Sequence, residues 1–216
     1  MYKEKEKYMS LGIKNVKIAR VDKAGHVIVG ADGIFSDATD KTGVFTADQD
    51  TAKGVASVAF ANLAGTLNPI YGSDKLVYQS SGKGAPTATV TVNALPNEIK
   101  QAVLGNKADG KGGFTISGKG DANNRIALLV ESRESFDDSK PIYVSLYMSA
   151  VTEASSTMTS NNASENRSQD VLLFTAVERG DDGFGKFYFA SAKGFDADAM
   201  QKDVFVPASA TPTGGQ

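Results

Sequence analysis

The sequence predicts a mainly β protein, a β-sandwich or small barrel with one α-helix packed on its side. About ten short apolar or alternating segments are separated by polar turns, as in an all-β fold, and 22 of the 216 residues are glycine. Only residues 94–105 have the apolar spacing of a convincing helix. No repeat or break in composition divides the chain. One domain over residues 11–206 is therefore expected between a charged arm, residues 1–10, and a flexible tail, residues 207–216.

The expected strands follow two patterns. Residues 11–21 and 55–63 alternate apolar with polar or small side chains, which is typical of a half-buried strand. Residues 125–132 (RIALLVES) form one of the most apolar runs and predict a central strand. The remaining expected strands are residues 26–29, 76–78, 87–92, 114–117, 141–148, 170–177 and 187–190.

The helix prediction depends on a change of period at about residue 93. Asn93 is a candidate N-cap, Pro96 fits a first helical turn, and Gly105 can adopt the left-handed conformation that ends a helix. A helix of about ten residues is marginal alone, so we expect it to pack on the sheet. Its apolar stripe consists of Leu95, Ile99, Ala102 and Val103.

Two connections are longer than ordinary hairpin loops, and long loops in compact domains are usually functional or disordered. Residues 152–169 are polar and lack Gly and Pro, which predicts either a long exposed connection or an edge strand with a loop. Residues 30–53 contain five Asp and two Lys. Four apolar residues of this second loop would be poorly buried if it were free, so some of them are expected to meet a partner. They are Ile34, Phe35, Val44 and Phe45.

Composition argues against several function classes. Lys and Arg total 23 against 25 Asp and Glu, so no global basic field suggests nucleic-acid binding. Without Cys there is no disulfide or thiolate zinc site, and a histidine triad would have to use His26. Residues 105–112 resemble a phosphate-binding loop but lack its Ser or Thr and follow a helix. We therefore expect no catalytic residues, cofactor, metal or membrane segment.

Residues 70–105 contain a tyrosine-glycine strand, a Gly/Pro turn, a β-strand and the pattern NxLP…IKxxxLG. This combination resembles the central segment of the major tail (tail tube) proteins of long, non-contractile-tailed phages of Gram-positive bacteria. Residues 11–15, 125–147 and 170–177, and an ending at residues 195–205, agree in order with the same family. The pattern itself is carried by Asn93, Leu95, Pro96, Ile99, Lys100, Leu104 and Gly105.

The resemblance implies a tube domain whose copies form six-membered rings, and rings that stack into a hollow tail tube. Such a tube surrounds the tape-measure protein during assembly and later conducts DNA without specific binding. Tail terminator and distal tail proteins are further implied partners. The implied location is the virion tail, after assembly in the cytoplasm of the bacterial host.

Protruding loops are expected to supply the contacts between subunits or rings. The acidic loop, residues 30–53, and the Lys-bearing region, residues 106–125, have opposite net charge and are hypothesised to pair between rings. The alternatives are a carbohydrate-binding module for the host surface, disfavoured because Trp is absent, and a hydrolase. The candidate contact residues are Phe35, Asp40, Phe45, Asp48, Asp50, Lys107, Lys111, Glu165 and Arg167.

Overall fold

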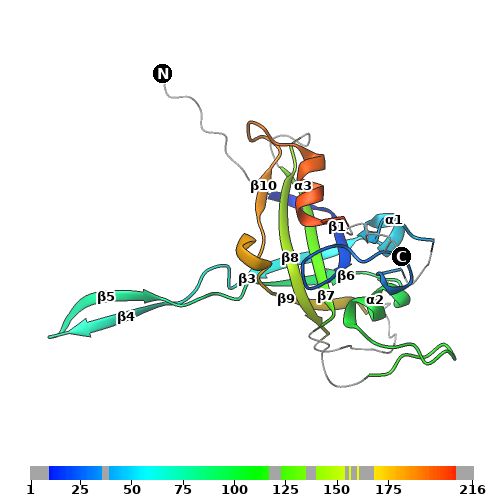
Figure 1. Ribbon diagram of the computed structural model, residues 1–216, viewed down its shortest axis with the longest axis horizontal. Helices are drawn as coiled ribbons and strands as arrows, with labels where there is room; N and C mark the ends of the chain where they lie inside the picture. Colours follow the sequence, from blue (N-terminus) through cyan, green and yellow to red (C-terminus); the bar gives the residue numbers. More distant parts are fainter. Residues whose placement is uncertain are drawn as a thin grey trace, which may run out of the picture.

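A computed structural model describes residues 10–35, 39–116, 123–134, 140–153, 156, 160 and 168–207. Its body is one eight-stranded antiparallel sheet with the order β2-β1-β7-β8-β9-β6-β3, in which β10 also pairs with β8. A separate two-stranded sheet, β4-β5, projects away from this body (Figure 1). The prediction of a mainly β fold is confirmed.

The elements are short and follow one another closely along the described chain. The strands are β1 (Ser10–Val21), β2 (Val44–Ala47), β3 (Val55–Ala61), β4 (Leu67–Gly72), β5 (Lys75–Ser81), β6 (Thr87–Val92), β7 (Arg125–Glu134), β8 (Ile142–Thr152), β9 (Asp170–Ala176) and β10 (Phe187–Phe189). The α-helices are α1 (Gln49–Ala52), α2 (Asn97–Leu104) and α3 (Ala197–Val204), and 3-10 turns lie at Gly30–Asp32 and Gly180–Asp182.

The sheet curves until strands near its opposite ends approach each other. β1 contacts β3 although β7, β8, β9 and β6 lie between them in the sheet order. Side chains from β1, β2, β6, β7, β8 and β9 therefore share one core, to which α2 contributes as well. The most deeply buried members include Val16, Val90, Val103, Ile126, Leu128, Leu172 and Phe174.

A second core lies on the other face of the sheet. Successive residues of β7 point to opposite faces, so Leu128 lies in the first core and Leu129 in the second. Helix α3 covers the second core with Met200 and Val204. Burial on both faces explains why residues 125–132 are almost continuously apolar, the feature that predicted a central strand.

A polar cluster around Asp203 fastens α3 to the sheet. Its carboxylate accepts hydrogen bonds from the hydroxyls of Tyr188, at 2.7 Å, and Tyr147, at 3.1 Å. It also accepts from Lys186 Nζ at 2.9 Å and from Arg179 Nη2 at 3.0 Å. The Arg179 guanidinium lies over the Tyr147 ring, 3.7 Å from its centroid. The cluster therefore joins β8, β10 and α3 through one carboxylate.

These contacts shift proton equilibria in the cluster. Burial opposes ionisation of Asp203, but hydrogen bonds from Lys186 and the tyrosines outweigh it and lower the pKa to about 2. Burial raises the pKa of Tyr147 to about 12 and also raises that of Tyr188. At neutral pH the cluster is thus an ionised carboxylate held by two neutral phenols and two cations.

Helix α2 is present where the sequence predicted it, but the predicted cap is wrong. Pro96 occupies the N-cap position, and no side chain caps this end of the helix. Asn93 lies too early in the chain to cap; its amide donates to the Lys53 carbonyl oxygen and accepts from Gln169. At the other end Gly105 has φ 72°, the left-handed conformation that ends helices.

The predicted strand at residues 26–29 is wrong, and so is the one at residues 114–117 over its described part, residues 114–116. Each region contributes only isolated bridges in the described chain, such as that between Ala108 and Phe114. Strand β2 and helix α1 were not predicted, and of β4 only the tyrosine-glycine end at residues 71–72 was indicated, by the family resemblance. The acidic loop is therefore not free, because β2 pairs with β1 along Val44–Ala47. Helix α3 lies within residues 195–205, the ending that agrees with the family, and was not predicted as a helix.

Candidate assembly surfaces

Strands β4 and β5 form a hairpin that extends well beyond the body of the protein (Figure 1). Its turn residues, Ser73 and Asp74, have φ values of 50° and 61°. Positive φ at both positions matches the type I′ turn that suits the twist of a two-residue hairpin. Pairing runs from Leu67 opposite Ser81 to Gly72 opposite Lys75, with one register shift near the tip.

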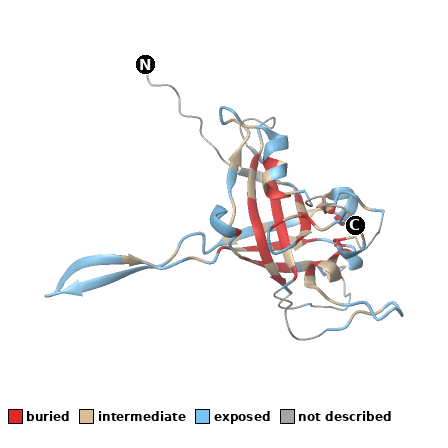
Figure 2. Ribbon diagram, in the orientation of Figure 1, coloured by how far each residue is buried: buried red, intermediate tan, exposed pale blue. Residues whose placement is uncertain are grey.

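The hairpin is apolar and yet exposed (Figure 2). Six of its large apolar residues have between 49% and 70% of their surface exposed to solvent. A two-stranded hairpin alone is marginally stable, and a contiguous exposed apolar patch usually marks an interaction surface. The hairpin is therefore the main candidate for a contact with another chain. Its exposed apolar residues are Leu67, Ile70, Tyr71, Leu76, Val77 and Tyr78.

The two chain segments that lead into the hairpin approach each other through glycine. A Cβ atom on Gly65 would lie 1.5 Å from the carbonyl oxygen of Gly82, which no side chain can accommodate. One on Gly84 would lie 2.8 Å from the carbonyl carbon of Ala64. The Gly82 N–H donates to the Thr66 carbonyl oxygen at 3.0 Å. This neck, residues 62–66 and 82–86, links the hairpin to β3 and β6.

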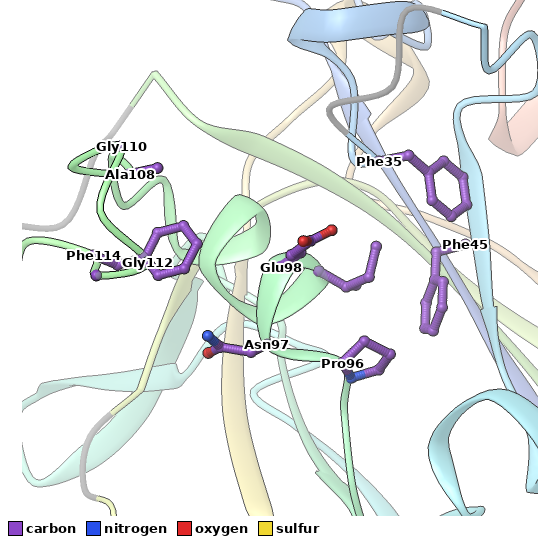
Figure 3. Close-up of a pocket in the computed structure, with 11 residues that line it drawn as sticks. Phe35, Phe45, Pro96, Asn97, Glu98, Ala108, Gly110, Gly112 and Phe114 are labelled. Atoms are coloured by element: carbon purple, nitrogen blue, oxygen red, sulfur yellow. The ribbon is translucent and has the colours of Figure 1, made fainter.

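A second apolar surface surrounds the start of α2 (Figure 3). It is an open cavity of about 780 Å³ whose apolar lining includes Phe35, Phe45, Pro96, Ile99 and Phe114. The rings of Phe35 and Phe45 meet edge to face, with centroids 6.1 Å apart. The fold thus brings the acidic loop, α2 and the Lys-bearing loop together around one concavity.

The predicted phenylalanines are less exposed than expected. Phe45 is 6% exposed and belongs to the first core, and Phe35 packs against that core while partly buried. Ile34, only 1% exposed, is also a core residue. The premise that these residues lack burial within one chain is wrong, because β2 joins the sheet beside β1 and this segment packs into the first core. Their contact role remains a prediction.

Two of the predicted acidic contacts organise local structure. Asp40 accepts hydrogen bonds from the backbone N–H groups of Thr42 and Gly43. Asp48 caps α1: the Thr51 N–H and hydroxyl bond to its carboxylate and hold its pKa below the ordinary value. Asp50 is exposed in the first turn of α1, and among the described residues no hydrogen bond to its carboxylate is seen.

The predicted basic contacts lie beside the cavity. Lys107 and Lys111 are exposed on the loop that follows α2. That loop is shaped by Asp109, whose carboxylate accepts from the N–H groups of Lys111 and Gly113. Glu165 and Arg167 lie outside the described residues.

Helix α2 is tied to the sheet by a half-buried ion cluster. Lys100 Nζ lies 2.7 Å from Glu153 and 2.8 Å from Asp170, and the Lys100 side chain is 14% exposed. Asp170 also accepts from the Leu95 N–H at 3.0 Å. At the other end of the helix, Asn124 donates to the carbonyl oxygens of the last turn. Both ends of α2 are thus held, which fixes one wall of the cavity.

Replacing Lys100 with methionine is expected to lower the free energy of unfolding by about 2 kcal/mol, since two carboxylates would face each other without their cation. Urea unfolding measures the change. The control is Lys83→Met, because Lys83 is 88% exposed and meets Glu178 only at 3.6 Å. Its effect is expected to stay below about 0.5 kcal/mol. Equal effects for the two variants would contradict the bracing role of Lys100.

The described residues place no group of three or more His, Asp or Glu side chains where they would hold a metal ion. His26 sits in a turn with its Nδ1 3.2 Å from Asp22. No helix among the described residues is long and apolar enough to cross a membrane.

The sequence was compared with models of protein families and with curated proteins. A sequence model of the family described as "Phage tail tube protein" matches residues 9–213 of the chain. A comparison with curated proteins returned no match. The family match spans nearly the whole sequence, including every strand and helix described above. The chain therefore belongs to the phage tail tube protein family, and it is a structural, non-enzymatic component of the tube in the tail of the virion.

Proposed function

We propose that copies of this chain close into six-membered rings, and that the rings stack into the tail tube of a siphovirus-type phage of Gram-positive bacteria. Self-assembly is supported chiefly by the projecting β4-β5 hairpin, whose apolar side chains are exposed in the single chain. A ring of identical subunits needs a projecting surface on each copy and a receiving surface on the next. The hairpin is the projecting surface, and the cavity beside α2 is the receiving surface.

The number of copies in a ring and the host group follow from the resemblance over residues 70–105. So do the other partners: the tape-measure protein inside the growing tube, the tail terminator and the distal tail proteins. DNA would pass through the lumen with transient, non-specific contacts. The balanced charge of the chain supports this role, because clustered Lys and Arg would bind phosphates and retard DNA transit.

Electron microscopy of negatively stained, purified protein at high concentration tests the proposal. Rings, short stacks or tubes are the expected result. Protein that stays monomeric and binds cell-wall polysaccharide would contradict it and support a host-surface carbohydrate-binding module instead. Averaged end-on views would count the copies in each ring.

The proposed charge pairing between rings is tested best at Asp50. Asp40 and Asp48 hold local structure, so reversing their charge would disturb the fold as well as any contact. Asp50→Lys is expected to reduce tube formation several-fold at low salt and little at high salt, where screening removes the attraction. Lys111→Glu in the same chain should restore assembly. Unchanged assembly and unchanged salt dependence in Asp50→Lys would exclude the pairing.

A further inference from the structure

The apolar side chains of the hairpin are divided between its two faces. Residues opposite each other in an antiparallel pair share a face, and neighbours along a strand point to opposite faces. Tyr71 pairs with Leu76, and Leu67 lies four residues before Tyr71 on the same face. We call Leu67, Tyr71 and Leu76 the first face.

The opposite face carries a matching set. Ile70 pairs with Tyr78, and both point away from the first face. Val77 lies at the register shift, so its face is assigned from a contact. A Cβ atom on Gly72 would lie 3.0 Å from the Val77 side chain, so Val77 lies on the face of Gly72. Gly72 is two residues after Ile70 in β4 and shares its face. Ile70, Val77 and Tyr78 form the second face. Each face thus has one tyrosine and two aliphatic side chains.

This division differs from that of an ordinary exposed hairpin. A hairpin that lies on one surface keeps apolar residues on the covered face and polar residues on the other. Here residues on both faces are about half exposed or more, from 49% for Ile70 to 70% for Val77. Because the faces point in opposite directions, one flat surface can cover only one of them.

We propose that the hairpin is inserted between two neighbouring copies of this chain, with one copy against each face. The inference rests on the proposed function, since it takes the tube as the assembly that supplies both neighbours. Along the paired strands the hairpin carries ionisable charge only at its tip, Asp74 and Lys75, so its contacts are apolar. The cavity beside α2 is a concavity on the same chain, and its lining includes apolar side chains that could cover one face of the hairpin.

Identical copies are the partner that the observations favour. A tail tube is built from repeated copies of its subunit, so every copy meets the same surfaces in its neighbours. The glycine-lined neck connects the hairpin directly to β3 and β6, and the hairpin lies outside both hydrophobic cores. The insertion would therefore couple neighbouring subunits without requiring their cores to change.

Matched substitutions test whether both faces are needed. The first-face variant carries Tyr71→Ser and Leu76→Ser, and the second-face variant carries Val77→Ser and Tyr78→Ser. Each is expected to reduce the pelletable tube fraction at least tenfold, with a Tm close to that of the wild type. The control, Gln79→Ala with Ser80→Ala, changes one polar residue on each face and should assemble normally. Wild-type assembly by either face variant would overturn the proposal.

Cross-linking tests whether two copies are involved. The chain has no Cys, so Tyr71→Cys and Tyr78→Cys create unique sites for a photoreactive maleimide. A chain labelled at both sites is mixed at low fraction into unlabelled protein, and the tubes are irradiated. Cross-linked trimers, one labelled chain with two unlabelled copies, are the expected product. Single-label chains should give dimers.

The outcomes separate this inference from the proposed function. Dimers in which mass spectrometry finds both sites attached to the same copy would overturn the two-copy arrangement while leaving tube formation intact. Wild-type protein that forms neither rings nor tubes would overturn both proposals. Trimers from tubes, together with the loss of assembly in both face variants, would establish the insertion.

Discussion

The variant Asp203→Ala is expected to be about 3 kcal/mol less stable than the wild type, because it leaves Arg179 and Lys186 without their shared anion. Arg179 is the critical partner, since its side chain is only 8% exposed. Urea unfolding of the purified protein measures the change. The two tyrosine hydroxyls would also lose this acceptor, and α3 would be left with the packing of Met200 and Val204 and the bond from Arg179 Nη1 to the backbone carbonyl oxygen of residue 203.

Two further variants sharpen this experiment. Asp203→Asn keeps the shape and some hydrogen bonds, so an intermediate loss of about 1 to 2 kcal/mol is expected. Asp181→Ala is the matched control, because Asp181 is exposed in the neighbouring 3-10 turn; a change within about 0.5 kcal/mol is expected. A loss in Asp203→Ala no larger than in Asp181→Ala would contradict the anchoring role.

The same carboxylate predicts a pH dependence. Its pKa is lowered from the ordinary 3.8 to about 2 in the folded protein, so its contribution to stability is complete above about pH 5 and is lost as the pH falls towards 2. Other carboxylates also have lowered pKa values, among them Asp22 and Asp40. The difference between wild type and Asp203→Asn isolates Asp203, and it should shrink between about pH 5 and pH 2.

The parts of the fold that the sequence predicted are those in which local pattern and burial agree. Residues 125–132 are apolar on both faces because two cores meet on β7, and residues 97–104 show helical spacing because one side of α2 is buried. The left-handed Gly105 has a local cause as well. These features can be found without knowing what the segments pack against.

The missed features depend on partners distant in sequence. Val44–Ala47 is only four residues long, and it becomes a strand because β1 offers a free edge for pairing. Asn93 precedes a helix and resembles a cap, yet Pro96 lies between them and takes the N-cap position. Phe45 is predicted to be available to another chain only as long as β2 is not recognised as a strand. In each case the local pattern was short or ambiguous and tertiary pairing decided the outcome.

The sequence indicated that the segment containing the β4-β5 hairpin is characteristic of the family, but it did not predict that the hairpin projects from the body. Residues 70–105 carried the family resemblance, whereas the long acidic loop was predicted to make the contacts. Two signals in the sequence could have indicated the hairpin. Ser73-Asp74 stands between two apolar runs at the spacing of a two-residue turn. Pro69 fits a two-stranded ribbon, in which each strand has a free edge.

Gly65→Ala is expected to reduce tube formation at least tenfold while leaving the body folded. The new methyl group would lie 1.5 Å from the Gly82 carbonyl oxygen, so the two segments of the neck must separate. Their separation would break the bond from the Gly82 N–H to Thr66 and turn the hairpin away from its neighbours. Sedimentation of tubes and electron microscopy measure assembly, and thermal unfolding reports on the body.

Gly82→Ala is the matched control for this variant. It lies in the same neck, yet its added methyl group would be 3.5 Å from the nearest atom, the Thr66 carbonyl oxygen, at an ordinary contact distance. Near-normal assembly is expected, with a change in stability below about 1 kcal/mol. If Gly65→Ala assembled as well as Gly82→Ala, the orientation of the hairpin would not matter for the tube. If Gly65→Ala lowered the Tm of the body as strongly as a core substitution, the neck would be part of the fold and not only a support for the hairpin.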